Sequence, residues 1–253
     1  MGKYKIRFLE YASANYPSQF FFADSYDNGE ITYISHGVSL VEGEGMRILI
    51  DSGVDFTKGE KAVIAKGGGI ENIHNPDKML AGVGLTPDDI DAVIVTHAHF
   101  DHIGGIGCYP NARIFLQKKE AFGFLALLGN PKTFGILDAY DPYDLHTLID
   151  LELEGRVFLL DGDADNIFPG IHVRIFEMCH SFASQVVLVD TDDTRYAFIG
   201  DEAITRANFT GVDSMPFFIP STKYAVGGKL NLLHAYQRLL DSVNGDINRI
   251  IRF

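Results

Sequence analysis

The segment from Ala92 to Ile106, AVIVTHAHFDHIGGI, constrains this chain most, because an apolar run typical of a buried strand leads directly into a cluster of potential metal ligands. The cluster holds four ligand-type side chains within six positions: His97, His99, Asp101 and His102. Side chains of an extended segment alternate between two faces, so the first three are expected on one side. The fourth joins them only where the chain turns, which the glycines at 104 and 105 make easy. The spacing predicts a centre for two metal ions and disfavours a strand end with solvated histidines.

Charge and composition disfavour several other classes of function. A formal net charge of −13 over 253 residues argues against nucleic-acid binding, which depends on clustered basic side chains, and no basic run exceeds Lys118-Lys119. The N-terminal sequence lacks a secretory signal, and no apolar run approaches the roughly 20 residues that cross a bilayer. We therefore expect a cytoplasmic protein with neither a membrane nor a nucleic-acid partner, and with Cys108 and Cys179 reduced.

Apolar and alternating runs predict strands in both halves of the chain. In the first half the expected strands cover residues 3–9, 31–41, 46–50, the segment that begins at 92, and 113–116. In the second half they cover residues 157–160, 171–176, 186–189 and 196–199.

Helical spacing predicts helices in both halves as well. They are expected over residues 58–66, 75–81, 118–128 and 229–243, with a capped turn at Thr86-Pro87. Residues 131–156 carry no clear pattern of either kind. Strands followed by helices in each half predict an α/β architecture of two similar half-units packed sheet on sheet. The site is then expected where the strand ends of both halves meet.

Two more ligand-type residues follow predicted strands in the second half. His180 comes after the strand at 171–176, and Asp201 comes after the strand at 196–199. Taken alone, each is explained equally well by a surface histidine or a turn-capping aspartate. A metal motif that needs further ligands favours both, so His180 and Asp201 join the candidate site.

With these residues the sequence resembles the metallo-β-lactamase superfamily and, within it, the N-acyl homoserine lactonase-like group. The matching features are the H-x-H-x-D-H motif at 97–102, Asp51-Ser52-Gly53, His180, Gly200-Asp201, LTPDDID at 85–91 and Pro110-Asn111-Ala112. The resemblance covers nearly the whole chain. It implies one domain over residues 1–253 with the four-layer αββα sandwich of this superfamily, and a dinuclear zinc site at one edge.

The resemblance also implies how two zinc ions, or two other divalent ions, share the ligands. One ion takes the histidines at 97, 99 and 180. The other takes Asp101, His102 and a later histidine, and Asp201 bridges both. The later histidine is expected after the strand at 247–253, so we expect the chain to lack its C-terminal end. His234 is the alternative, although it falls inside a predicted helix.

Several other positions bear on the substrate. The resemblance implies a tyrosine three residues after the bridging aspartate, where this chain has Ile204. This departure disfavours homoserine lactones and is compatible with other lactones, cyclic amides or esters. The alternative is that Tyr140, Tyr143 or Tyr224 occupies the same space. Glu202 stands where one class of β-lactamase has a cysteine, which disfavours that activity. The remaining residues weighed for the site are expected to be structural or exposed: Cys179, the histidines at 36, 74, 146 and 172, and the phenylalanines at 20–22, 209 and 217–218.

These ligands predict hydrolysis by a metal-bound hydroxide, because a metal lowers the pKa of its bound water from near 16 to about 7. Asp101 is expected to orient this nucleophile and to pass a proton to the leaving group, while Asp201 holds the two metals. We predict a lactonase-like enzyme that opens a lactone or similar cyclic ester of a small molecule. The alternatives are a thioester or cyclic amide hydrolase, or a non-catalytic binding protein. A homodimer is one oligomeric state left open.

Overall fold

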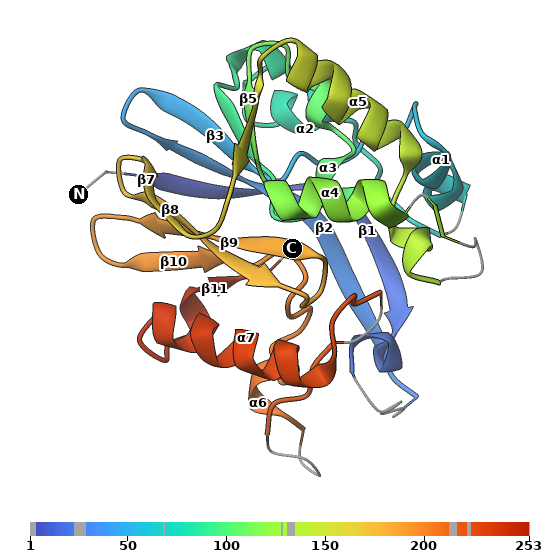
Figure 1. Ribbon diagram of the computed structural model, residues 1–253, viewed down its shortest axis with the longest axis vertical. Helices are drawn as coiled ribbons and strands as arrows, with labels where there is room; N and C mark the ends of the chain where they lie inside the picture. Colours follow the sequence, from blue (N-terminus) through green and yellow to red (C-terminus); the bar gives the residue numbers. More distant parts are fainter. Residues whose placement is uncertain are drawn as a thin grey trace.

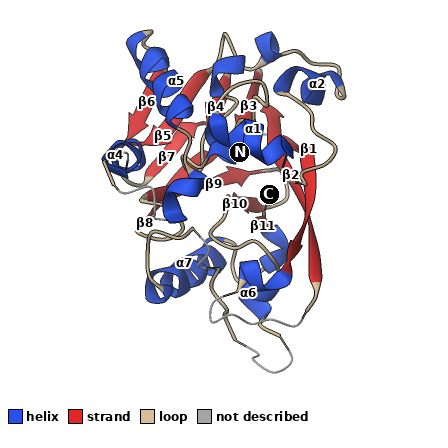
Figure 2. Ribbon diagram, turned by 90° about the vertical axis from the view of Figure 1, so that its right-hand side faces the viewer, coloured by secondary structure: helices blue, strands red, loops and turns tan. Residues whose placement is uncertain are grey.

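Two β-sheets pack face to face and helices cover both outer faces, which gives the predicted four-layer αββα sandwich (Figure 1 and Figure 2). The computed structural model describes residues 4–22, 29–67, 69–127, 129–130, 135–212, 217–221 and 224–252. The predicted α/β fold is confirmed.

Within these residues the first sheet has six strands in the order β1-β2-β3-β4-β5-β6. They are β1 (Lys5–Pro17), β2 (Ile31–Gly43), β3 (Met46–Ile50), β4 (Ala92–Ile94), β5 (Arg113–Gln117) and β6 (Val157–Leu160). The pairs β1·β2 and β2·β3 are antiparallel, and β3 to β6 are parallel to one another. Parallel strands end at the same edge of a sheet, so the segments that follow β3, β4 and β5 meet there.

The second sheet, in the described part of the chain, has five strands in the order β11-β10-β9-β8-β7. They are β7 (Ala164–Phe168), β8 (Ile171–Glu177), β9 (Ala183–Asp190), β10 (Arg195–Phe198) and β11 (Ile250–Ile251). Neighbours are antiparallel except β10 and β11, which are parallel. The sequence did not predict β7, whose pairing with β8 is irregular. Of the strand expected at 247–253, β11 is the described part, and a 3-10 helix, Ile247–Arg249, precedes it.

The α-helices among the described residues lie outside the two sheets. They are α1 (Glu60–Gly67), α2 (Pro76–Ala81), α3 (Phe100–Ile103), α4 (Lys118–Leu127), α5 (Pro142–Leu153), α6 (Ala207–Thr210) and α7 (Lys229–Ser242). In Figure 1, α1 to α5 cover the first sheet and α7 covers the second. The predicted helices α1, α2, α4 and α7 are confirmed, with Leu128 outside the described residues. The segment without a clear pattern contains α5, whose cap residue Asp141 accepts a hydrogen bond from the Tyr143 amide at 2.9 Å.

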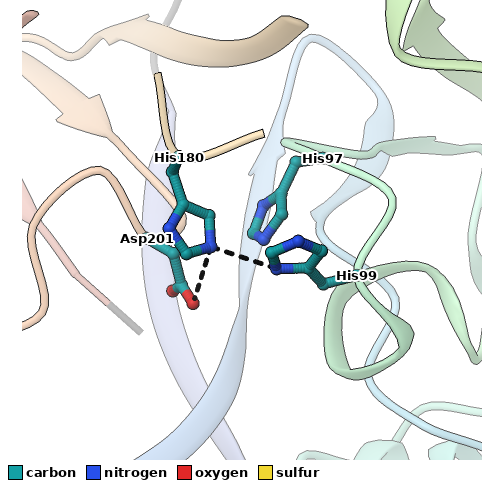
Figure 3. A group of neighbouring side chains, drawn as sticks. All are labelled: His97, His99, His180 and Asp201. Carbon is teal, nitrogen blue, oxygen red and sulfur yellow. Dashed lines mark hydrogen bonds and ion pairs between the residues drawn. The ribbon is translucent and has the colours of Figure 1, made fainter. Parts of the chain in front are cut away.

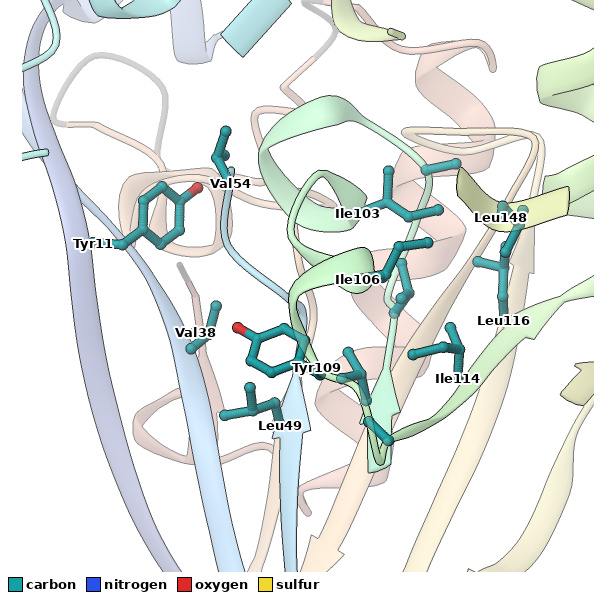
Figure 4. Close-up of a cluster of buried hydrophobic side chains, with 14 of the residues drawn as sticks. Tyr11, Val38, Leu49, Val54, Ile103, Ile106, Tyr109, Ile114, Leu116 and Leu148 are labelled. Carbon is teal, nitrogen blue, oxygen red and sulfur yellow. The ribbon is translucent and has the colours of Figure 1, made fainter. Parts of the chain in front are cut away.

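Three buried apolar clusters hold the layers together. Ile50, Ile94 and Phe198 belong to the cluster between the two sheets. A second cluster packs the first sheet against its helices, and Figure 4 shows part of it. The third packs one face of α7, including Leu232 and Leu239, against the second sheet. Burial of this surface is the main force that fixes the sheet edge on which the motif lies. None of the described helices combines the length and apolarity needed to cross a membrane.

Candidate metal centre

The motif that follows β4 lies on a loop and a short helix, because β4 ends at Ile94. The helix α3 begins at Phe100 and has His99 as its N-terminal cap residue. The predicted alternation of side chains is therefore wrong after His99. A helical turn replaces the extended geometry, and it brings Asp101 beside His102 instead of aligning it with the two preceding histidines.

The first ligand group gathers side chains from three separate strand ends. Its members are His97, His99, His180 and Asp201, and their potential ligand atoms all lie within 4.8 Å of one another (Figure 3). The Nε2 atom of His180 is 3.0 Å from Nδ1 of His99 and 3.6 Å from Oδ2 of Asp201. The sheet-on-sheet packing thus unites the residues after β4 with those after β8 and β10.

The second ligand group lies against the first and shares one residue with it. It comprises Asp101, His102 and Asp201. Nε2 of His102 is 3.4 Å from Oδ1 of Asp201 and 3.8 Å from Oδ2 of Asp101. Asp201 therefore directs one carboxylate oxygen toward each group, which is the arrangement that a bridging ligand needs.

The histidines of the first ligand group are in the neutral form that binds a cation. The ring nitrogens Nε2 of His97, Nε2 of His99 and Nδ1 of His180 are buried and have no hydrogen-bond partner among the described residues. Burial, followed by the neighbouring imidazoles, lowers the pKa of His97 and His99 well below the usual value. Neutral imidazole is the metal-binding form, and zinc binds imidazole nitrogens together with carboxylate oxygens. The donor set therefore fits zinc, and Nε2 of His97 is available to a metal because Nδ1 of that ring contacts the Thr96 hydroxyl at 3.0 Å.

Asp51 orients the ring of His102 by contacting Nδ1, the nitrogen that faces away from the second ligand group. Its Oδ2 atom is 2.7 Å from Nδ1 of His102 and accepts a hydrogen bond from the Thr96 hydroxyl at 2.9 Å, and its Oδ1 accepts the Thr96 amide at 2.6 Å. Burial opposes protonation of His102, but the charges of Asp51, Asp201 and Asp101 outweigh it and raise its pKa well above the usual value. His102 thus presents Nε2 to the second group, in an acidic environment that also favours a cation.

Glu120, the third residue of α4, ties the two ligand-bearing loops together. Its carboxylate is fully buried and accepts hydrogen bonds from the Ala98 amide at 2.9 Å, the Ser181 hydroxyl at 2.8 Å and the Ala183 amide at 2.7 Å. Ala98 separates the first two histidines of the motif, and Ser181 follows His180. The role of Glu120 could not be predicted from the sequence, because an acidic residue after Lys118-Lys119 resembles an ordinary exposed helix start.

Gly200 allows Asp201 to approach the motif. Its φ angle of +53° lies in the left-handed region, and a Cβ atom there would lie 2.5 Å from Oγ1 of Thr96 and 3.1 Å from Nδ1 of His97. Any larger residue would push the two segments apart. The Gly200-Asp201 pair noted in the sequence therefore has a steric cause.

A cavity of about 520 Å³ opens onto both ligand groups. Apolar side chains form much of its wall, among them Phe20, Phe21 and Ile204. The expectation that the aromatic segment at 20–22 is structural holds for Phe21, which is buried in the core and also borders the cavity, whereas Phe20 is half-buried and lines the cavity wall. The cavity is also lined by His36 and Tyr224, so one of the histidines treated as structural or exposed reaches the site.

The remaining candidate residues belong to neither ligand group. His234 is exposed on α7 and belongs to neither ligand group, and Tyr143 is 38% exposed on α5. The ring of Tyr140 packs edge-on against His99, with 4.7 Å between the centroids. Cys179 is buried near α7, as predicted, and its thiol contacts the Asn231 carbonyl at 3.7 Å. Phe209 lies in the core as expected, whereas Phe217 is 60% exposed.

The family follows from a match with known sequences. A family model described as the metallo-beta-lactamase superfamily matches residues 35–238. The chain belongs to this superfamily. A relative named N-acyl homoserine lactonase, from Bacillus cereus, is 26% identical over 187 residues, which is 70% of this chain and 67% of the relative.

Solved structures share the fold of this chain. An N-acyl homoserine lactone hydrolase with the product N-hexanoyl-L-homoserine at its catalytic metal centre matches with a TM-score of 0.67 and 21% identity, over 100% of this chain and 92% of that chain. A dizinc quorum-quenching lactonase matches with a TM-score of 0.69 and 17% identity, over 95% and 84%. The family, the relatives and the ligand groups together support a metal-dependent hydrolase.

Proposed function

We propose that this chain is a dinuclear zinc hydrolase that opens a lactone or similar cyclic ester of a small molecule. The observation that carries the proposal is the pair of ligand groups that share Asp201 at the base of a cavity with apolar walls. The sequence similarity to the N-acyl homoserine lactonase from Bacillus cereus favours a lactone over other substrates. The activity belongs to a single domain over residues 1–253.

In this proposal the six candidate ligands divide between two zinc ions. His97, His99 and His180 would hold the first ion. Asp101 and His102 would hold the second, and Asp201 would contribute to both. The unpaired Nε2 of His97 supports this division, and so do the two oxygens of Asp201, each directed at one group.

The chemistry divides between the ions and the side chains around them. The chemistry that zinc would supply at these ligands is polarisation of the scissile carbonyl and a bound water acidic enough to attack at neutral pH. Asp101, whose side chain is 24% exposed, orients the attacking water and accepts its proton. The water oxygen bonds to the carbonyl carbon, the ring C–O bond breaks, and the proton passes from Asp101 to the leaving oxygen to give a hydroxy acid. The Tyr11 hydroxyl holds Asp101 in place by donating to its backbone carbonyl at 2.7 Å.

The test is turnover by the purified, zinc-loaded chain. Ring opening releases a proton, so titration at constant pH follows hydrolysis of N-hexanoyl homoserine lactone, an unsubstituted γ-lactone, a thioester and a cyclic amide. Lactone hydrolysis with about two zinc ions per chain is expected. A zinc-loaded chain that hydrolyses the thioester or amide but no lactone contradicts the assigned substrate, and one that hydrolyses none contradicts the enzyme.

A pair of variants separates Asp101 from general effects of charge. Asp101→Asn keeps the ligands of the first ion but removes the proton acceptor, so kcat is expected to fall by about 10²–10⁴. Asp77→Asn, the same change at an exposed position on α2, is the matched control and leaves kcat unchanged. An Asp101→Asn variant with the kcat of the control refutes the role of Asp101.

A further inference from the structure

Two polar side chains from the first two strands form a hydrogen-bonded pair on the wall of the cavity. The hydroxyl of Tyr16 and Nε2 of His36 are 3.0 Å apart, and the two rings meet edge to face with 5.9 Å between centroids. Tyr16 lies opposite Thr32, and His36 lies opposite Ala12. Thr32 and His36 are four residues apart on β2, so both members of the pair extend from the same face of the hairpin.

This pair lies close to the proposed metal ligands. Tyr16 and His36 line the same cavity as Asp101, His102 and Asp201. Burial raises the pKa of Tyr16 to about 12, and the charges of Asp101 and Asp201 add to this effect. Burial lowers the pKa of His36, although the same two carboxylates oppose it. Both side chains are therefore neutral near pH 7, and both are within the electrostatic influence of the second ligand group.

A neutral phenol and a neutral imidazole together carry two polar hydrogens. One hydrogen lies between them in their mutual hydrogen bond, whichever of the two is the donor. The other hydrogen is on the Tyr16 hydroxyl or on Nδ1 of His36 and is directed away from the mutual bond. The pair therefore always keeps one donor for a third group. Phe21, whose ring lies 5.8 Å from that of Tyr16, and Ile204 on the same cavity wall carry no donor, whereas Tyr224 on that wall carries a hydroxyl.

We propose that Tyr16 and His36 form a substrate-binding pair that donates a hydrogen bond to an oxygen of the lactone ring. This inference rests on the proposed function, because it assumes an ester substrate held beside Asp101 and Asp201. It makes both side chains determinants of catalytic efficiency without making them metal ligands.

Conservative variants of the full-length, zinc-loaded chain test the pair. Tyr16→Phe and His36→Asn are each expected to lower kcat/KM about tenfold or more with the zinc content unchanged. The two side chains act as one unit. The double variant is therefore expected to lose no more kcat/KM than the less active of the two single variants. The loss is expected for N-hexanoyl homoserine lactone and for the unsubstituted γ-lactone alike, because the contact is to the ring.

Matched controls apply the same changes outside the cavity. Tyr33→Phe alters a 58% exposed tyrosine of β2, and His234→Asn alters an exposed histidine of α7. Both are expected to keep the kcat/KM of the unaltered chain. Tyr16→Phe with wild-type kcat/KM, or with a loss that follows its zinc content, overturns the proposal. If kcat/KM falls for N-hexanoyl homoserine lactone but not for the unsubstituted γ-lactone, the proposed contact to the lactone ring is wrong.

A direct binding measurement separates this inference from the proposed function. If the chain hydrolyses no lactone, the proposed function fails, but N-hexanoyl homoserine lactone then stays intact and can be titrated into the zinc-loaded protein by calorimetry. Binding that weakens about tenfold or more in Tyr16→Phe and not in Tyr33→Phe supports a pair that contacts the ligand. Equal binding by both variants, or no binding by the unaltered chain, overturns it.

Discussion

Replacing Glu120 with alanine is expected to destabilise the protein and to weaken zinc binding. Glu120 is the one acceptor shared by the Ala98 amide, the Ser181 hydroxyl and the Ala183 amide, at 2.9, 2.8 and 2.7 Å. Alanine leaves all three donors buried without this acceptor. The loop on either side of Ala98 and the loop after His180 then lose the contact that holds them at a fixed separation.

The size of the effect follows from the number of donors. A buried donor left unpaired costs about 1–3 kcal/mol, so three of them cost at least about 3 kcal/mol. A natural domain is stable by about 5–15 kcal/mol, so the variant is expected to fold. Residues that orient metal ligands change metal affinity by about tenfold to a hundredfold, and we expect the lower end because Glu120 contacts the backbone between the ligands. Glu120→Gln keeps one oxygen as an acceptor and is expected to lie between alanine and the unaltered chain.

Urea unfolding of the zinc-free protein measures the first effect, and competition with a chromophoric chelator measures the zinc dissociation constant. Glu177→Ala is the matched control, because Glu177 is exposed and pairs with Lys119 at 2.6 Å on the surface. Such a surface pair contributes about 0–1 kcal/mol. The reasoning is refuted if Glu120→Ala loses no more stability than Glu177→Ala and binds zinc as tightly as the unaltered chain.

Three further changes probe the surroundings of the site. Gly227→Ala is expected to lower both stability and zinc affinity, measured by urea unfolding and chelator competition, because the added Cβ would lie 1.5 Å from the Met178 carbonyl oxygen, next to the His180 segment. Burial, followed by nearby carboxylates, raises the pKa of Asp144 from 3.8 to about 8, so the folded protein retains a proton that the unfolded chain has lost. Stability therefore falls as pH rises between these values, and unfolding at pH 5 and pH 8 is expected to show a smaller fall for Asp144→Asn. Asp51→Asn weakens the support of the His102 ring, so zinc titration is expected to reveal weaker binding of one ion by about tenfold to a hundredfold.

Strongly patterned elements could be predicted from the sequence, because their burial depends on their own residues. The strands at 31–41 and 171–176 and the helix at 229–243 are examples. The helix α5 was missed although its start signals, Asp141 and Pro142, were present, since its apolar pattern is weak. The strand β7 was missed because it pairs irregularly and depends on β8 for its position.

The candidate ligands could be predicted because metal chemistry restricts which residue types bind, whereas their grouping could not. Alternation along an extended segment assigned Asp101 to the wrong side, since nothing local revealed that the chain becomes helical at Phe100. Glu120 and the Tyr16–His36 pair escaped detection for another reason. Their roles depend on contacts with residues 20 to 63 positions away in sequence, which only the packed sheets create.

The positions of bound metal test the central claim most directly. Crystals of the zinc-loaded chain, measured on both sides of the zinc absorption edge, are expected to give two anomalous peaks per molecule. One peak is expected among His97, His99 and His180, and the other beside Asp101 and His102, with Asp201 in contact with both. Zinc-loaded crystals with no anomalous peak within bonding distance of these side chains would contradict the account.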